Sequence, residues 1–140
     1  SGVRLLIFGN IQDDVKDSMD KLLQENPNVT FVGWLAAEKV YDYFFAGDLI
    51  AFPGGHSVLW EQACASKTPC LFGNWPGIEH LNNGGNSTFL EDTSLESIKK
   101  TIQELKFTEK YQTMLEAARS EKTDIYRYSV IAQKSLEATR

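Results

Sequence analysis

The stretch Phe52-Pro-Gly-Gly-His-Ser-Val-Leu-Trp-Glu-Gln-Ala63 gives the clearest structural signal in the chain. An apolar run ends at Phe52, two glycines follow, and Ser57 is a residue type that caps helix N-termini. In an open α/β sheet, ligands bind at the carboxyl ends of the strands. Glycines there let the backbone approach the ligand, and free N–H groups at a helix start bind phosphate. The stretch therefore predicts a strand–loop–helix unit that binds a phosphate or diphosphate.

Apolar runs of the same kind recur about every 20 residues, and segments with helical periodicity lie between them. The runs are continuous rather than alternating, which is typical of strands covered on both faces. Strand–helix–strand alternation with short links implies parallel strands and right-handed crossovers. We therefore predict an α/β fold with one open parallel sheet of about five strands flanked by helices. The predicted strands are 5–8, 29–32, 49–52, 69–72 and, more weakly, 87–90, and the helices are 13–25, 37–46 and 57–66.

After residue 93 the pattern changes to helices, which predicts a helical C-terminal tail. Thr93-x-x-Glu96 has the spacing of a capping box. The last helix is predicted from about Asp124 to Ala138, and its apolar side chains are expected to face inward: Tyr128, Ile131, Ala132 and Leu136. The 140 residues fit a single domain, residues 1–140.

The composition excludes some classes of partner and favours others. The net charge of −5 argues against nucleic acid. Nine of the 14 Lys and Arg residues follow residue 98, so the tail is mildly basic and suits either ordinary solvated helices, which we favour, or peripheral contact with a membrane. Cys64 and Cys70 lie in apolar surroundings without a disulfide or zinc pattern, which favours buried thiols and a cytoplasmic setting. No Asp-x-Asp pair is present, so we expect no metal site.

Glu61 and His56 are the candidate polar groups of the glycine-containing stretch. Glu61 lies four residues after Ser57, so both share one face of the predicted helix, and its carboxylate could accept hydrogen bonds from two ribose hydroxyls. The alternative is an exposed helix acid after an ordinary turn. We favour His56 as a donor to a phosphate or sugar hydroxyl. A role as general base, which would make it a catalytic residue, lacks a partner carboxylate in the sequence pattern.

The same stretch matches two other classes of protein, esterases and phospho-receivers, less well. Gly55-His-Ser-Val-Leu59 partly matches the nucleophile elbow of esterases, but Leu59 stands where the second glycine is needed. A phospho-receiver would need an aspartate at the end of the third strand, where the chain has Phe52 and Pro53.

The spacing of several motifs resembles the C-terminal domain of GT-B glycosyltransferases, in particular the large retaining group 1 family with its polysaccharide and capsule enzymes. The resemblance covers residues 3–138, and it implies a Rossmann-like domain that binds a nucleotide-diphosphate sugar. The motifs are Phe8-Gly9, Asn28-Val-Thr-Phe-Val-Gly33, Ala46-Gly-Asp-Leu-Ile50, Glu61-Gln-Ala-Cys-Ala-Ser-Lys-Thr-Pro69 and Gly84-Gly-Asn86.

The resemblance implies a role for each matching residue. Glu61 would bind the ribose of a UDP-sugar, and the turn before it would bind the diphosphate and the sugar through Gly54, Gly55, His56, Ser57, Val58 and Leu59. Trp34 would flank the base, and Gly9 and Asn10 would face the donor. The enzyme would transfer the sugar to a saccharide or lipid-linked acceptor without a cofactor. A non-hydrolysing nucleotide-sugar epimerase is the alternative.

The sequence departs from the family pattern at several positions, so some residue roles of the family cannot be assigned to this chain. The family often has two acids eight positions apart, and Pro53 stands eight before Glu61, with His56 in the shortened loop. The family's phosphate-binding Arg and Lys and its N-terminal acceptor domain would precede Val3, so we expect this part alone to be inactive. The Trp75–His80 loop is either an aromatic wall of the donor cleft or a packed loop.

Overall fold

The computed structural model describes residues 2–138, which form two compact units. The first unit ends at Val40 and the second begins at Tyr41. The prediction of one domain over residues 1–140 stays a prediction.

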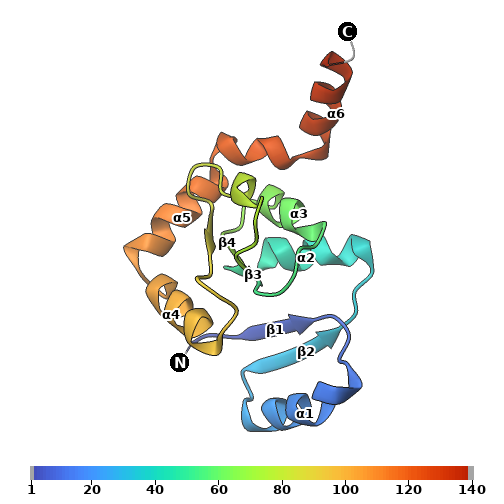
Figure 1. Cartoon of the computed structure of the whole chain (residues 1–140), viewed down its shortest axis with the longest axis vertical. Coiled ribbons are helices and arrows are strands. Elements are labelled where there is room, and N and C mark those ends of the chain that lie inside the picture. The colour runs from blue at the N-terminus through green and yellow to red at the C-terminus, as the bar shows by residue number, and fades with distance from the viewer. Residues whose placement is uncertain (1, 139–140) are drawn as a thin grey trace. The chain divides into compact units, whose positions relative to one another are not determined.

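The first unit is a strand–helix–strand unit with parallel strands (Figure 1). Strand β1 (Leu5–Phe8) pairs with β2 (Val29–Gly33), and the turn η1 (Asp13–Val15) and helix α1 (Lys16–Glu25) connect them. Asn26 ends α1, because its backbone (φ −128°, ψ 89°) is not helical, and its side-chain amide donates to the carbonyl of Leu22 at 2.9 Å. This confirms the predicted strands and the intervening helix.

The second unit contains a three-stranded parallel sheet in the order β3–β4–β5. Its strands are β3 (Ile50–Phe52), β4 (Cys70–Phe72) and β5 (Ser87–Phe89). Helix α3 (Leu59–Ala65) connects β3 to β4, and the turn η2 (Glu79–Leu81) lies between β4 and β5. Helix α2 (Ala37–Ala46) has the predicted bounds and leads into β3.

The prediction of a single sheet of about five strands is wrong about which strands are hydrogen-bonded to one another. The hydrogen-bonded strands form a two-stranded and a three-stranded sheet. Continuous apolar runs identify strands because burial on both faces selects those residues. They do not specify which backbone pairs with which, since a ladder is built from N–H and C=O groups that every residue type shares.

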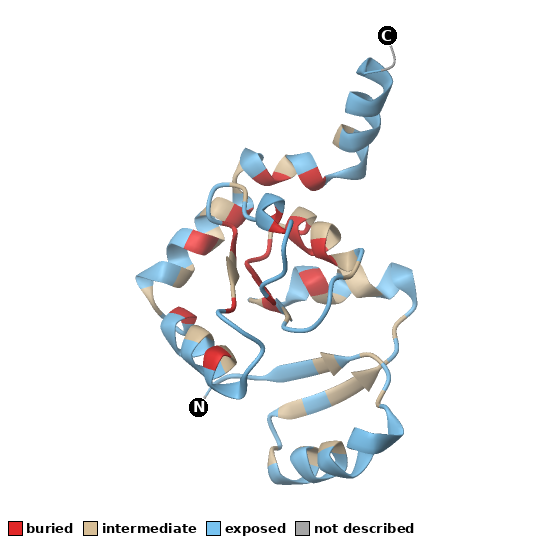
Figure 2. Ribbon diagram, viewed as in Figure 1, coloured by how far each residue is buried: buried red, intermediate tan, exposed pale blue. Residues whose placement is uncertain are grey.

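Aromatic side chains form the core of the second unit. Trp60 on α3 is fully buried and stacks on Phe72 of β4, with ring centroids 4.9 Å apart. Phe52 of β3 stacks on Phe72 at 6.1 Å. Figure 2 shows the buried residues concentrated in β4 and α3. Cys64 and Cys70 are free thiols in this core, as the apolar surroundings of both cysteines predict.

The C-terminal part is helical, as predicted, with different boundaries. It comprises α4 (Leu95–Leu105), α5 (Glu109–Arg119), η3 (Glu121–Tyr126) and α6 (Tyr128–Glu137). The capping box at Thr93 is wrong by one residue. Ser94 is the cap of α4, because the Ser94 hydroxyl accepts a hydrogen bond from the amide of Ser97. The amide of Ser94 in turn donates to the carboxylate of Asp92. Within residues 2–138, no helix combines the length and apolar character needed to cross a membrane.

Helix α6 does not face inward as predicted. Tyr128 is 65% exposed and Leu136 71% exposed. The cause is Arg127, whose extended backbone (ψ 132°) separates η3 from α6 and interrupts the predicted continuous helix. Helix α6 therefore extends away from the three-stranded sheet of its unit (Figure 1).

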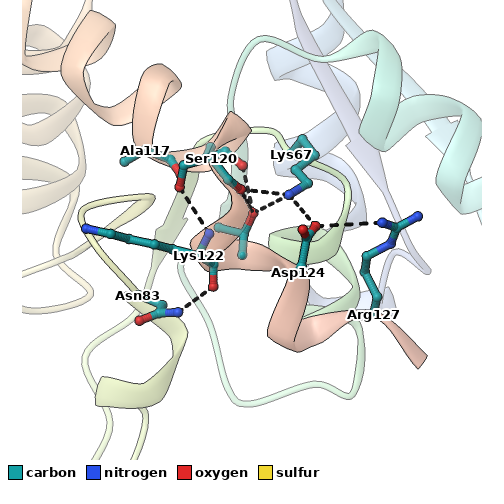
Figure 3. A network of polar contacts seen from close by, with 9 residues as sticks. Lys67, Asn83, Ala117, Ser120, Lys122, Asp124 and Arg127 are labelled. Atoms are coloured by element: carbon teal, nitrogen blue, oxygen red, sulfur yellow. Dashed lines mark hydrogen bonds and ion pairs between the residues drawn. The ribbon is translucent and has the colours of Figure 1, made fainter. Parts of the chain in front are cut away.

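Lys67 ties the end of α3 to η3. Its backbone has a φ of 65°, which ends the helix, and its ammonium donates to the Ser120 carbonyl, the Thr123 hydroxyl and the Asp124 carboxylate at 2.8, 2.9 and 2.6 Å (Figure 3). These three bonds use all the donors of the ammonium. The hydrogen bond from Lys67 lowers the pKa of Asp124, and Arg127 at 3.8 Å acts in the same direction.

The Lys67–Asp124 contact predicts an acid-sensitive contribution to stability. Because the folded-state pKa of Asp124 is lowered, the contribution is present above the ordinary aspartate pKa and is lost as pH falls through the folded value. We expect the urea midpoint of wild type to fall more between pH 5 and pH 3 than that of Asp124→Asn. The exposed α1 substitution Asp20→Asn is the control and should keep the wild-type slope. Equal slopes for wild type and Asp124→Asn would contradict the prediction.

Candidate donor-binding site

The loop after β3 is held in place from the neighbouring strand β4. The amide of Gly73 donates to the carbonyl of Phe52 at 2.8 Å, and the indole of Trp75 donates to the carbonyl of Gly54 at 3.0 Å. A Cβ on Gly73 would lie 2.7 Å from the Pro53 carbonyl oxygen, so a side chain at this position would displace the loop. Trp75 is therefore a support of the glycine-containing loop, and its side chain is 44% exposed.

Helix α3 begins at Leu59, two residues after the predicted start. Ser57 still organises this end, because its hydroxyl accepts from the amide of Leu59 at 3.3 Å and its carbonyl from the amide of Trp60 at 3.0 Å. Val58, the cap residue, makes no side-chain cap and is 75% exposed. The first turn of α3 places Glu61 beside this loop.

Glu61 lies between two histidines. Its Oε1 is 3.0 Å from Nε2 of His80 and 3.9 Å from Nε2 of His56. The first distance is a hydrogen bond, whereas the second is too long for one. The side chains of Glu61, His56 and His80 are 34%, 54% and 51% exposed, so all three are accessible to a ligand. The carboxylate near His56 was not expected from the sequence.

His80 is fixed on its other sides as well. Its Nδ1 is 3.1 Å from the carbonyl oxygen of Gly77, and its own carbonyl accepts a hydrogen bond from the Tyr126 hydroxyl. The adjacent Leu81 is fully buried and anchors η2 in the core. Burial raises the pKa of Tyr126, so its hydroxyl stays protonated and acts as a donor. Tyr126 is itself buried.

The Gly84-Gly-Asn86 motif supports the same segment. Asn86 is fully buried, and its amide donates to the carbonyl of Leu81 at 3.0 Å while its oxygen accepts from the amide of Asn83 at 2.7 Å. Gly84 and Gly85 have φ values of 90° and 100°, which L side chains rarely adopt. The motif therefore shapes the loop that returns from η2 to β5.

The predicted site residues fall into both units. The second unit brings Gly54, Gly55, His56, Ser57, Val58, Leu59 and Glu61 together around the start of α3. In the first unit, Gly9 and Asn10 follow β1 and Trp34 follows β2. The amide of Gly9 donates to the carbonyl of Gly33 at 3.0 Å, so these two strand ends adjoin, and Trp34 is 75% exposed.

His80 is not among the site residues predicted from the sequence. It ends the Trp75–His80 loop, for which the sequence left open an aromatic wall or a packed loop. The position of this loop in the chain could have indicated His80. The loop follows β4, and the carboxyl ends of adjacent parallel strands meet at one edge of a sheet. Among residues 2–138, no three His, Cys, Asp or Glu side chains are grouped in a way that could hold a metal ion.

Solved structures share this fold. Sucrose-phosphate synthase from Thermosynechococcus elongatus matches with a TM-score of 0.72 at 19% identity, over 98% of this chain and 38% of that chain. A glycosyltransferase from Rickettsia africae matches with a TM-score of 0.71 at 17% identity, over 97% and 39%. Anabaena HepE in complex with UDP-glucose matches with a TM-score of 0.69 at 19% identity, over 98% and 40%. The fold is that of one part of a GT-B glycosyltransferase.

This similarity concerns the fold and only part of each larger protein. The chain spans about two fifths of the length of these solved structures. No protein-family model matches the chain, and no curated protein matches it by sequence.

Proposed function

We propose that this chain is the C-terminal, donor-binding domain of a glycosyltransferase that uses a nucleotide-diphosphate sugar. The observation that carries the proposal is the position of Glu61, an accessible carboxylate in the first turn of α3 beside the supported loop after β3. This is the edge of a parallel sheet where ligands bind. The presence of UDP-glucose in HepE, which shares the fold, supports a UDP-sugar as the donor.

Each polar group of the proposed site has a task that its chemistry fits. Glu61 accepts hydrogen bonds from the ribose hydroxyls, and the Gly54–Leu59 loop faces the diphosphate and the sugar. His56 packs edge-on against Trp60, with ring centroids 5.0 Å apart, and its imidazole donates to a phosphate or sugar oxygen. Gly9, Asn10 and Trp34 stay predicted donor contacts from the first unit.

The activity of the whole enzyme is also part of the proposal. It would transfer the sugar from UDP to a saccharide or lipid-linked acceptor in polysaccharide biosynthesis, together with an N-terminal domain that binds the acceptor. We propose a cytoplasmic location with peripheral association with the membrane. The transfer uses no cofactor, because the nucleotide-sugar is itself the activated substrate.

The non-hydrolysing epimerase is the weaker alternative. That chemistry needs several acids and basic groups close to the diphosphate. The described ion pairs beside the loop join one carboxylate, Glu61, to two histidines, His56 and His80.

Nucleotide titration tests the proposed function. We expect UDP to bind with an affinity in the micromolar to millimolar range and to raise the melting temperature. UDP should bind more tightly than GDP or ADP. Calorimetry and thermal shift measure both effects. No response to any of the three nucleotides at millimolar concentration would contradict the proposal.

A further inference from the structure

His80 contacts an oxygen atom with each of its ring nitrogens. Nε2 lies 3.0 Å from Glu61 Oε1, and Nδ1 lies 3.1 Å from the carbonyl oxygen of Gly77. Carboxylate and carbonyl oxygens are acceptors, so each contact requires a proton on the ring nitrogen. The ring satisfies both contacts when it is protonated at both nitrogens, and the bond to Glu61 is then charge-assisted.

The support for His80 comes from three separate elements. The Gly77 carbonyl belongs to the loop after β4, the Tyr126 hydroxyl belongs to η3, and the buried Leu81 holds η2. Segment η3 is itself tied to α3 through Lys67 and Asp124. The imidazole is therefore held at both nitrogens and through its backbone, and it can restrain a neighbouring side chain.

Glu61 is a side chain that needs such restraint. A glutamate has several rotatable bonds, and fixing them costs conformational entropy that a ligand must otherwise overcome. The described contacts of the carboxylate engage Oε1, through His80 at 3.0 Å and His56 at 3.9 Å. They leave Oε2 for another donor.

We propose that His80 is a positioning residue that holds the Glu61 carboxylate through Oε1, so that Oε2 meets the ribose hydroxyls of the nucleotide. The inference rests on the proposed function, because it assigns a support to the residue proposed to bind ribose. The titratable and charged groups around the imidazole are Glu61 from α3, His56 from the loop after β3, Tyr126 from η3 and the adjacent Glu79 of η2. Of these, Glu61 makes the direct hydrogen bond to the ring.

The test compares the binding of UDP and 2′-deoxy-UDP to the 140-residue chain by calorimetry. The ratio of their dissociation constants isolates the ribose contact, because both ligands carry the same base and diphosphate. A hydrogen bond to a charged group corresponds to a ratio of about tenfold or more in wild type. We expect His80→Ala to bring the ratio to within about threefold of one. His80→Gln, which keeps a donor near Nε2, should retain part of it.

Rescue by the conservative variant separates positioning from a merely structural role. The glutamine amide of His80→Gln can donate to Glu61 Oε1, whereas His80→Ala offers no donor there. We therefore expect the UDP to 2′-deoxy-UDP ratio to fall in the order wild type, His80→Gln, His80→Ala. Contributions of the base and the diphosphate cancel in this ratio, since both ligands share them.

His56→Ala is the matched control. His56 is beyond hydrogen-bonding distance of Glu61, so its loss should weaken both ligands equally and leave the ratio unchanged. A wild-type ratio in both His80 variants would overturn the inference while leaving the proposed function intact, provided that Glu61→Gln lowers the ratio. Absence of UDP binding to wild type would instead overturn the proposed function. If His80→Ala unfolds, as circular dichroism would show, His80→Gln decides the outcome.

Discussion

Replacing Glu61 with alanine is expected to weaken UDP binding by about 10- to 100-fold, because hydrogen bonds to a charged group contribute about 1.5–3 kcal/mol. The loss should appear in the dissociation constant measured by calorimetry. The affinity for 2′-deoxy-UDP should fall less, since that ligand lacks one of the two hydroxyls assigned to the carboxylate. Glu61→Ala is not expected to unfold the protein, because the side chain is about one-third exposed and its direct hydrogen bond joins it to another exposed side chain, that of His80.

Glu79→Ala provides the control for this substitution. Glu79 is an exposed acid of η2, next to His80 in the chain, so its removal changes the local charge by the same amount. It should leave UDP affinity within about twofold of wild type, since long-range effects of exposed charges are screened by salt. Equal losses in both variants would show that Glu61 acts through general electrostatics, and an unchanged affinity in Glu61→Ala would remove its ribose role.

Replacing Trp60 with alanine is expected to cost about 3–5 kcal/mol of unfolding free energy, the range for large aromatic truncations in a core. Trp60 is fully buried and lies between Phe52, Phe72 and His56. Its indole Nε1 has no hydrogen-bond partner among the described residues. Trp60→Phe removes the buried Nε1 donor and also part of the side-chain volume. We therefore expect it to lower the unfolding free energy by about 1–2 kcal/mol. Urea unfolding followed by circular dichroism measures both values.

Trp34→Ala is the matched control for the core substitution. Trp34 is 75% exposed, so the same change should alter the unfolding free energy by about 0.5 kcal/mol or less. Similar costs for Trp34→Ala and Trp60→Ala would contradict the placement of the core on α3 and β4.

The sequence was sufficient for the elements whose residues are selected by burial. The run that ends at Phe52 predicts β3, and the helical periodicity from Ala37 to Ala46 predicts α2 at its observed bounds. The predicted cap of α3, Ser57, is one residue early, because Val58 is the cap residue, although the Ser57 hydroxyl does accept from the nearby amide of Leu59.

The parts that failed depend on contacts between distant residues. Periodicity shows that Tyr128 and Leu136 share an apolar stripe, but not that Arg127 breaks the helix and leaves the stripe exposed. Strand patterns likewise do not reveal the division into two sheets. The contact between Glu61 and His80 joins residues 19 positions apart on different elements, so no local pattern could reveal it.

The central claim is that a nucleotide-diphosphate occupies the loop and first turn around Glu61. Amide chemical shifts of the isotope-labelled chain, recorded during a UDP titration, test it most directly. The account predicts the largest saturable shift changes at the amides of Gly54 to Glu61, with smaller ones at His80, and their loss in Glu61→Ala. UDP-dependent shifts confined to other parts of the chain, with the Gly54–Glu61 amides unmoved, would contradict it.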